Sequence, residues 1–152
     1  NALIGSCAVE IKKSLDDSLS ELDYLQRVQH ELFNLGNMIA TLPQDFNSKM
    51  PAIDELDIEY MEDKIDFLNE GLPVLKSFVL PGGSDLSVKF HIARSVCRRC
   101  ERLVVELSES DEINNLIIMY LNRLSDLLFV LSRWSNNIQN IKEYIWNPNY
   151  RD

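Results

Sequence analysis

The sequence predicts an all-α protein, an up-and-down bundle of about five long helices. Apolar residues recur three and four positions apart through most of the chain, the spacing of one buried helix face. No segment shows the two-residue alternation that is typical of a half-buried strand. With 152 residues, the chain is long enough for one core and too short for two ordinary domains, so we expect a single helical-bundle domain over residues 1–152.

The first three helices follow from their apolar stripes and from the residues that interrupt them. Asp16-Asp17-Ser18 is expected to hold a bend and the N-cap of the second helix. Residues 44–53 read as a loop, and Gly71 and Pro73 are expected to end the third helix. The predicted ranges are Leu3 to about Asp16, from that bend to about Thr41, and Asp54 to Asn69.

The central stretch begins with an extended segment, Phe78-Val79-Leu80, which Pro81-Gly82-Gly83 stops. Ser84 is a suitable N-cap, and the helical pattern then continues to about Leu107. After a turn at 108–111, a last helix is predicted from about Glu112 to Asn137 or beyond. The residues expected to pack in the core are Phe90, Ala93, Cys97, Cys100, Val104 and Leu107 on the fourth helix, and Ile117, Leu121, Leu124, Leu128 and Leu131 on the fifth.

The charge balance excludes several classes of protein. A net charge of −9 argues against a general nucleic-acid binder or a protein that binds anionic membranes, since both need a positive surface. No apolar run approaches the roughly 20 residues needed to cross a bilayer. Three cysteines do not form a disulfide framework and fit a reducing compartment.

A row of arginines stands out in this acidic chain. Arg94, Arg98 and Arg102 lie four positions apart and form a second line on the fourth helix, beside Glu101. In the simpler interpretation the arginines form a solvated outer face with helical ion pairs, each of which stabilises the helix by a few tenths of a kcal/mol. The alternative is that the guanidinium groups bind an anion.

The last helix carries a matching polar line. Asn122 and Asp126 share a face and are flanked by Arg123, in a region otherwise rich in Leu, Ile and Phe. Helices that a short turn joins lie side by side, so the two polar lines can form one shared site. Spacing alone does not decide between that site and two solvated faces.

Several long runs resemble one known family. They are FVLPGGS, HIARSVCRRCER and YLNRLSDLLFVLSRW, with VQHELFNLG and KIDFLNEGLPVLKSF before them. In order and over nearly the whole chain, they closely resemble the ATP:cob(I)alamin adenosyltransferases of the propanediol-utilisation O type. The resemblance implies a cobalamin adenosyltransferase-like five-helix bundle, assembled as a homotrimer with active sites between adjacent subunits.

The same resemblance implies an activity. Such an enzyme transfers the 5′-deoxyadenosyl group of ATP to the cobalt of reduced cobalamin and releases triphosphate, with Mg²⁺ sharing the phosphate charge. ATP and cobalamin would be the substrates, and a cobalamin reductase and an adenosylcobalamin-dependent mutase would be possible partners. We expect a cytoplasmic enzyme, or a mitochondrial one if the source is eukaryotic and a targeting segment precedes this sequence.

The family's functional residues carry over onto matching positions. The resemblance implies that Arg94 and Arg98 engage ATP and organise the subunit interface, and that Glu101 and Asn122 line the nucleotide site. Arg123 and Asp126 belong to the same motif as Asn122. Phe78 matches the aromatic residue that sits under the corrin ring, although from the residues alone it reads as a core phenylalanine.

One part of the family pattern is not in this sequence. Members carry a Gly/Thr-rich loop that contacts phosphate, followed by a Val-Asp-Glu-Leu-type run before the first helix. The acidic partner expected for Arg94 across the interface belongs to that segment. We expect the segment to precede Asn1; the alternative is a protein defective in ATP binding. No Walker A pattern stands elsewhere to replace the loop.

Two alternatives to an adenosyltransferase follow from the helical pattern. The chain could be a non-catalytic helical-bundle scaffold whose arginine line docks an acidic partner. A di-iron bundle lacks support because no Glu-x-x-His pair occurs. No metal site is predicted, since Cys97 and Cys100 lie mid-helix on the packing stripe and read as core residues. His91 matches a family histidine, with packing as its expected role.

Overall fold

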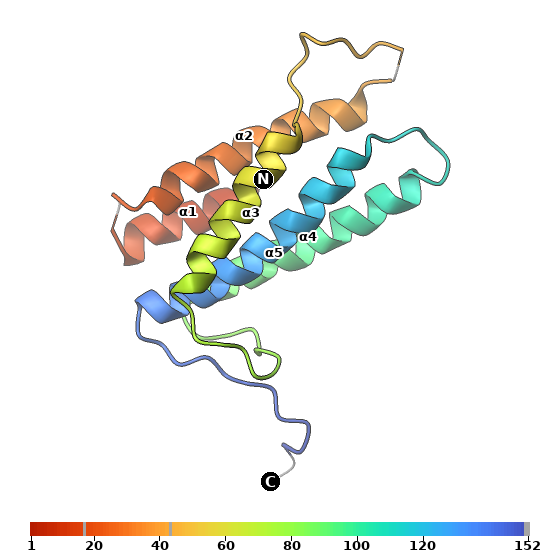
Figure 1. Ribbon diagram of the computed structural model, residues 1–152. Coiled ribbons are helices and arrows are strands. Elements are labelled where there is room, and N and C mark those ends of the chain that lie inside the picture. The colour runs from red at the N-terminus through yellow and green to blue at the C-terminus, as the bar shows by residue number, and fades with distance from the viewer. Residues whose placement is uncertain (17, 43, 151–152) are drawn as a thin grey trace.

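The computed structural model describes residues 1–16, 18–42 and 44–150, and Figure 1 shows their arrangement. Within these residues the regular structure is helical, with one isolated antiparallel bridge between Val79 and Ile145. The predicted all-α class is confirmed. The five helices are α1 (Ala2–Ser14), α2 (Ser20–Ala40), α3 (Glu55–Glu70), α4 (Asp85–Leu107) and α5 (Asn115–Ile138).

The helices run up and down, with α5 at the centre of the packing. Helix α5 packs against α4 and α3, while α1 packs against α4 and α2. Residues 44–54 and 108–114 lie at one end of the bundle, and residues 71–84 and 139–150 lie at the other (Figure 1). The segment before α4 and the chain after α5 therefore meet at one end.

The predicted N-cap of α4 is confirmed, and α3 and α5 also begin with side-chain caps. Asp54 and Asp57 form a capping box at α3, and Ser84 Oγ accepts a hydrogen bond from Ser87 N at 3.0 Å at α4. The predicted cap of α2 is wrong for the described residues, because Leu19 occupies the N-cap without a side-chain bond. Asp16 instead accepts from Ser18 N at 2.8 Å and holds the bend; Asp17 lies outside the described residues.

Helix α5 begins later than its apolar pattern suggested. Its N-cap is Asn114, whose side chain accepts a hydrogen bond from Leu116 N, so the helix starts at Asn115 and not near Glu112. By length and composition α5 is also the one described helix that could cross a membrane. In this fold it is mostly buried between its neighbours, as the core helix of a bundle is.

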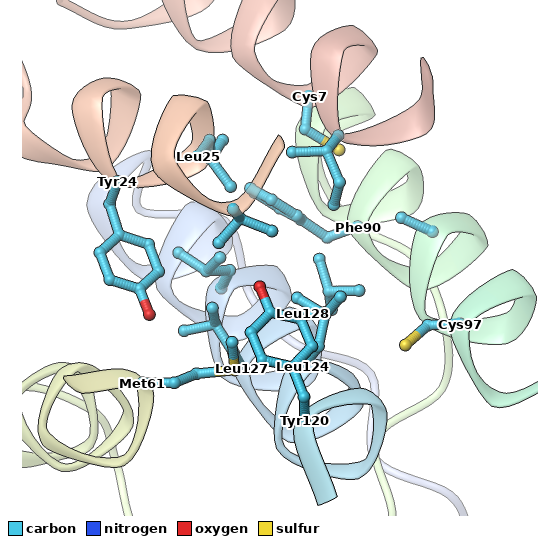
Figure 2. Packing of buried hydrophobic residues seen from close by; sticks show 14 of the residues in the cluster. Cys7, Tyr24, Leu25, Met61, Phe90, Cys97, Tyr120, Leu124, Leu127 and Leu128 are labelled. Atoms are coloured by element: carbon cyan, nitrogen blue, oxygen red, sulfur yellow. The ribbon is translucent and has the colours of Figure 1, made fainter. Parts of the chain in front are cut away.

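The core consists of the apolar stripes that face α5. Figure 2 shows Phe90 and Cys97 of α4, Met61 of α3 and Leu25 of α2 converging on that helix. All five residues predicted for the α5 stripe are buried. Two positions expected in the α4 stripe are not: Cys100 is exposed, and Leu107 is 36% exposed. Cys100 lies about 60° around the helix from Cys97, because three residues fall short of a full turn.

Candidate functional site

The two polar lines meet at the seam between α4 and α5. Asn122 Nδ2 donates a hydrogen bond to Glu101 Oε1 at 2.8 Å, and Glu101 is largely buried in that contact. Arg123 Nη2 donates to Asn122 Oδ1 at 2.8 Å, and Arg123 Nη1 lies 3.2 Å from Asp126 Oδ2. Four of the predicted site residues are therefore joined in one chain of contacts.

Helix α3 adds a residue that the sequence reading missed. Glu62 Oε1 lies 3.7 Å from Arg123 Nε, so a carboxylate from a third helix reaches the same guanidinium. Glu62 follows the buried Met61 on α3, and no local sequence pattern indicates that it pairs with Arg123, about sixty residues later. We refer to Glu62, Glu101, Asn122, Arg123 and Asp126 as the seam network.

A cavity opens beside the seam network. It has a volume of about 280 Å³ and is lined by residues of α3, α4 and α5. Ile58, Ile118 and Met119 supply its apolar lining, and members of the seam network supply its polar groups. An apolar floor with a few polar groups at its rim is typical of a site that binds a small molecule.

Arg94 differs from an ordinary surface arginine. It is half-buried, and its guanidinium carbon lies 5.3 Å from the centroid of the Phe129 ring. Its Nε is buried and has no hydrogen-bond partner among the described residues. A buried donor without an acceptor is costly, and arginine is the side chain that best binds phosphate in such a setting. Arg94 therefore has free donor capacity for an anion.

The other two arginines of the line are exposed. The Arg98 side chain is 45% exposed, and its Nη1 lies 4.0 Å from Glu101 Oε2 at the edge of the seam network. Arg102, one turn further along, is exposed. The fold thus places Arg94 against Phe129 and Arg98 at the edge of the seam network, while Arg102 is exposed.

Phe78 is not the core phenylalanine that its sequence context suggested. Its side chain is 77% exposed in the segment between α3 and α4, because the segment runs over the end of the bundle. The ring of Trp146 stands edge-on to it, with centroids 5.9 Å apart and planes at 67°. An exposed aromatic ring that is supported from one side suits contact with a large apolar ligand.

The turn after Phe78 is fixed by a residue that the sequence reading did not single out. Asn136 of α5 is 1% exposed; its Oδ1 accepts from Ser84 N at 2.8 Å, and its Nδ2 donates to Gly82 O at 3.1 Å. Gly83 has φ 97°, and a Cβ there would collide with the Asn136 amide. The Pro-Gly-Gly turn and the start of α4 are therefore held on α5.

Neither His91 nor Cys97 is prepared for chemistry at this site. Burial lowers the pKa of His91, and the charge of Arg94 lowers it further, so the imidazole is neutral and packs edge-on against Phe129. Burial raises the pKa of Cys97 to about 12, and its thiol donates to Leu121 O at 3.3 Å. Cys97 is a core thiol, as predicted.

Phe78 and the seam network lie far apart within the chain. Phe78 precedes the N-terminus of α4, whereas Glu101 lies 16 residues after Asp85. At about 1.5 Å per residue this places the two regions roughly 24 Å apart along α4, with Arg94 and His91 between them. One chain therefore presents a polar region and an apolar region along one helix.

Comparison with known proteins points to one family. The family model described as cobalamin adenosyltransferase matches residues 1–135. Similar proteins include a cobalamin adenosyltransferase of Cupriavidus metallidurans, 42% identical over 122 residues, and a corrinoid adenosyltransferase of Bacillus subtilis, 38% identical over 138 residues. These matches cover 80% and 90% of this chain but 63% and 68% of those proteins, so the chain spans about two thirds of their length.

Solved structures agree with the sequence relatives. A phenylalanine-to-alanine variant of a PduO-type ATP:corrinoid adenosyltransferase from Lactobacillus reuteri, complexed with cobalamin and ATP, matches with a TM-score of 0.83 at 28% identity. The match covers 95% of this chain and 80% of that one. An arginine-to-lysine variant complexed with ATP matches with a TM-score of 0.82 at 26% identity, covering 96% and 80%. The chain belongs to the cobalamin adenosyltransferase family.

Proposed function

We propose that the protein transfers the 5′-deoxyadenosyl group of ATP to the cobalt of a reduced corrinoid and releases triphosphate. Its membership of the family supports this activity, and so do relatives described as corrinoid adenosyltransferases. The observation on which the proposal depends is the arrangement at the α4–α5 seam. There, a half-buried arginine with a free donor lies along the same helix as an ordered amide–carboxylate network.

The reaction needs little covalent chemistry from the protein. Reduced cobalt(I) is itself a strong nucleophile: its electron pair forms the cobalt–carbon bond, while the C5′–oxygen bond breaks and its electrons leave with triphosphate. The protein must hold C5′ in line with the cobalt and stabilise the charge on the departing group. A site without a general base or a protein nucleophile is sufficient for that task.

Arg94 and Arg98 suit the stabilisation of triphosphate. A guanidinium group is planar, always charged and able to form two parallel hydrogen bonds with phosphate. Arg94 offers its unpaired Nε, and Arg98 is held only by a long contact of 4.0 Å to Glu101. Both can therefore turn toward phosphate without breaking a strong contact within the chain.

Asn122 and Glu101 suit the nucleoside part of ATP. Asn122 is fixed from both sides, since it donates to Glu101 and accepts from Arg123. Arg123 is in turn held by Asp126 and Glu62, at 3.2 Å and 3.7 Å. A side chain whose rotamer is set by its neighbours can read a ligand with little loss of entropy. Asn122 and Glu101 would bind the nucleotide, and Arg123 and Asp126 would orient them.

Magnesium is proposed to accompany ATP and to be held mainly by it. The described residues contain no group of three His, Cys, Asp or Glu side chains that could hold a metal ion. Mg²⁺ commonly keeps several waters and binds through substrate phosphates with one or two carboxylates. The ion would therefore share the triphosphate charge with Arg94 and Arg98.

The complete site is proposed to lie between subunits of a homotrimer. Helix α4 exposes apolar side chains on the outside of the bundle, with Ile92 50% and Leu103 57% exposed. On the arginine face itself Val105 is 43% exposed, seven residues after Arg98, so a neighbouring copy that covers Val105 would also approach the arginine line. Burial of such side chains would stabilise the assembly. A reductase would supply the reduced corrinoid, an adenosylcobalamin-dependent mutase would use the product, and a cytoplasmic location remains our expectation.

A spectroscopic assay tests this function against the scaffold alternative. Full-length protein is mixed with ATP, Mg²⁺ and chemically reduced cobalamin, and the absorption spectrum is followed for formation of the cobalt–carbon bond. The enzyme gives the spectrum of adenosylcobalamin at a rate that depends on ATP. A scaffold protein gives no change beyond the protein-free mixture, and that result would exclude the proposal.

A further inference from the structure

The chain that follows α5 returns to the segment that carries Phe78. Trp146 N donates to Phe78 O at 2.8 Å, and Leu80 N donates to Tyr144 O at 2.8 Å, on either side of the Val79–Ile145 bridge. We refer to residues 141–146 as the strap. Figure 1 shows the strap and the segment between α3 and α4 at the same end of the bundle.

The strap is the main backbone support of the exposed segment. Among the described residues, the two bonds from the strap are the only backbone–backbone hydrogen bonds that residues 74–80 make. Ser77 Oγ adds a contact to Trp146 O at 3.4 Å. Val74 is 86% exposed and Phe78 77% exposed, so burial contributes little to the position of this segment. Without the strap, Phe78 would lie on a loop with few constraints.

A buried arginine fixes the strap to the bundle. Arg133 of α5 is 4% exposed; its Nε lies 3.0 Å from Glu143 Oε1, and its Nη2 donates to Pro73 O at 2.7 Å. One guanidinium group thus holds the strap and the start of the Phe78 segment on the same helix. A buried ion pair contributes little net stability compared with apolar packing, but it specifies one arrangement of the groups it joins.

Trp146 completes the support at the ring itself. Trp146 is 45% exposed, so it is not a core residue. Its ring contacts Phe78 from the side that faces the chain and limits the positions that the Phe78 ring can take. The other face of Phe78 stays open. The support of Phe78 therefore begins at Arg133 on α5, which binds Glu143 of the strap. It ends at Trp146, the strap residue whose ring contacts Phe78.

We infer that the strap positions Phe78, with Arg133, Glu143 and Trp146 as positioning residues. This inference rests on the proposed function, in which Phe78 occupies the lower face of the corrinoid. Cobalt(II) is hard to reduce while it keeps a lower axial ligand, so a ring held firmly in that place favours the four-coordinate form. Chemically reduced cobalt(I) has no such requirement. Loss of the strap should therefore slow the reaction that starts from cobalt(II) and spare the reaction that starts from cobalt(I).

The experiment compares Trp146→Ala and Glu143→Gln with Phe78→Ala and the wild type, in the full-length protein. Each variant is assayed from cobalt(I) cobalamin and from cobalt(II) cobalamin with a reductant. Electron paramagnetic resonance of the ATP-bound protein measures the fraction of four-coordinate cobalt(II). Tyr150→Ala serves as the matched control, because Tyr150 is an 84% exposed aromatic residue beyond the strap. Trp146→Phe serves as the conservative variant.

The expected result is a selective loss. Trp146→Ala and Glu143→Gln should reduce the cobalt(II) rate and the four-coordinate fraction roughly two- to tenfold, the range set by one aromatic contact. The cobalt(I) rate should change little in both variants, Trp146→Phe should restore most of the loss, and Tyr150→Ala should match the wild type. The thermal midpoint should change little in Trp146→Ala but should fall in Glu143→Gln, because the buried Arg133 guanidinium loses its carboxylate partner.

Two outcomes would overturn the inference while leaving the proposed function intact. In the first, the strap variants match the wild type although Phe78→Ala is slow from cobalt(II). In the second, both rates fall equally together with the thermal midpoint, which would show that the strap serves stability only. If the wild type itself forms no adenosylcobalamin from cobalt(I), the proposed function fails instead.

Discussion

Helix α5 carries two polar networks that use similar residues in different surroundings. On one side, Tyr120 Oη donates to Glu31 Oε2 at 2.7 Å, and Arg27 bonds to both Glu31 and Asp57. We refer to these four residues as the inner network. On the other side lies the seam network around Asn122, only two residues further along the helix. Two residues correspond to about 200° of rotation, so the networks face almost opposite ways.

The networks differ in how far their carboxylates are buried. In the inner network Tyr120 is fully buried, Glu31 is 5% exposed, and each of the four side chains has a partner in the chain. In the seam network every member also has a partner, but the Asp126 and Glu62 side chains are 47% and 52% exposed, and the neighbouring Arg94, outside the network, keeps an unpaired Nε among the described residues. A buried network specifies the fold, whereas a solvent-accessible one beside a free donor is available to a ligand.

Arg98→Ala should produce the largest effect and should act only on the seam side. If Arg98 contacts the phosphates of ATP, its loss should cost roughly 2–5 kcal/mol of ATP binding and transition-state stabilisation. The free energy of unfolding should change by less than about 0.5 kcal/mol, because the side chain is 45% exposed. Calorimetric titration with ATP and the adenosylation rate measure the first effect, and urea unfolding measures the second.

Arg102→Ala is the matched control, since it removes the same charge one turn further along α4, where the residue is exposed. Equal losses of ATP affinity and adenosylation rate in Arg98→Ala and Arg102→Ala would show that only the overall positive charge of the arginine line matters. That result would remove the distinction between the seam and the surface around it.

Tyr120→Phe should give the opposite pattern, with an intermediate effect. Burial, reinforced by the negative charge of Glu31, raises the pKa of Tyr120, so the hydroxyl stays protonated and donates to that carboxylate. Its removal leaves a buried carboxylate oxygen without this partner and should cost about 1–3 kcal/mol of stability. The adenosylation rate per folded molecule should stay unchanged.

Tyr60→Phe provides the control for the inner network. Tyr60 stacks on Tyr24 with ring centroids 5.4 Å apart, is 46% exposed, and its hydroxyl forms no hydrogen bond among the described residues. Loss of that hydroxyl should change stability by less than about 0.5 kcal/mol. A Tyr120→Phe protein as stable as this control would show that the inner network is not structural.

His91 should give the smallest effect, visible only as a dependence on pH. Its pKa in the fold is lowered by burial and by Arg94, which outweigh the opposite influence of Glu143. As the pH falls, His91 therefore takes up a proton in the unfolded chain at a higher pH than in the fold. The contribution of neutral His91 to the free energy of unfolding is complete above about pH 6.5 and is lost as the pH falls below that value. Urea unfolding between pH 7.5 and 5.5 should show a steeper decline in the wild type than in His91→Gln. Parallel curves would mean that His91 titrates as in the unfolded chain.

The helices and most of the core could be predicted from the sequence because their signals are local. Apolar residues three and four apart identify a buried face whatever packs against it, and Asp54 and Ser84 mark helix starts by their own chemistry. Cys100 shows the limit of that reasoning, because it belongs to the apolar stripe of α4 and is nevertheless exposed. The spacing of apolar residues does not reveal where a neighbouring helix stops covering them.

The site was predicted less completely because its pairings join distant parts of the chain. Resemblance to a family supplied Arg94, Arg98 and Phe78, but no local pattern pairs Glu62 with Arg123 or Glu143 with Arg133. The strap pairs residues 78–80 with 144–146, and neither segment alternates polar and apolar residues as a strand would. Such contacts depend on how the helices come together at their ends.

A crystal structure of the full-length protein with ATP and Mg²⁺ would test the central claim most directly. We predict that the triphosphate lies within hydrogen-bond distance of Arg94 Nε and of the Arg98 guanidinium, with the nucleoside beside Asn122 and a neighbouring copy covering α4. ATP bound elsewhere, or arginines that point into solvent away from any second chain, would contradict this account.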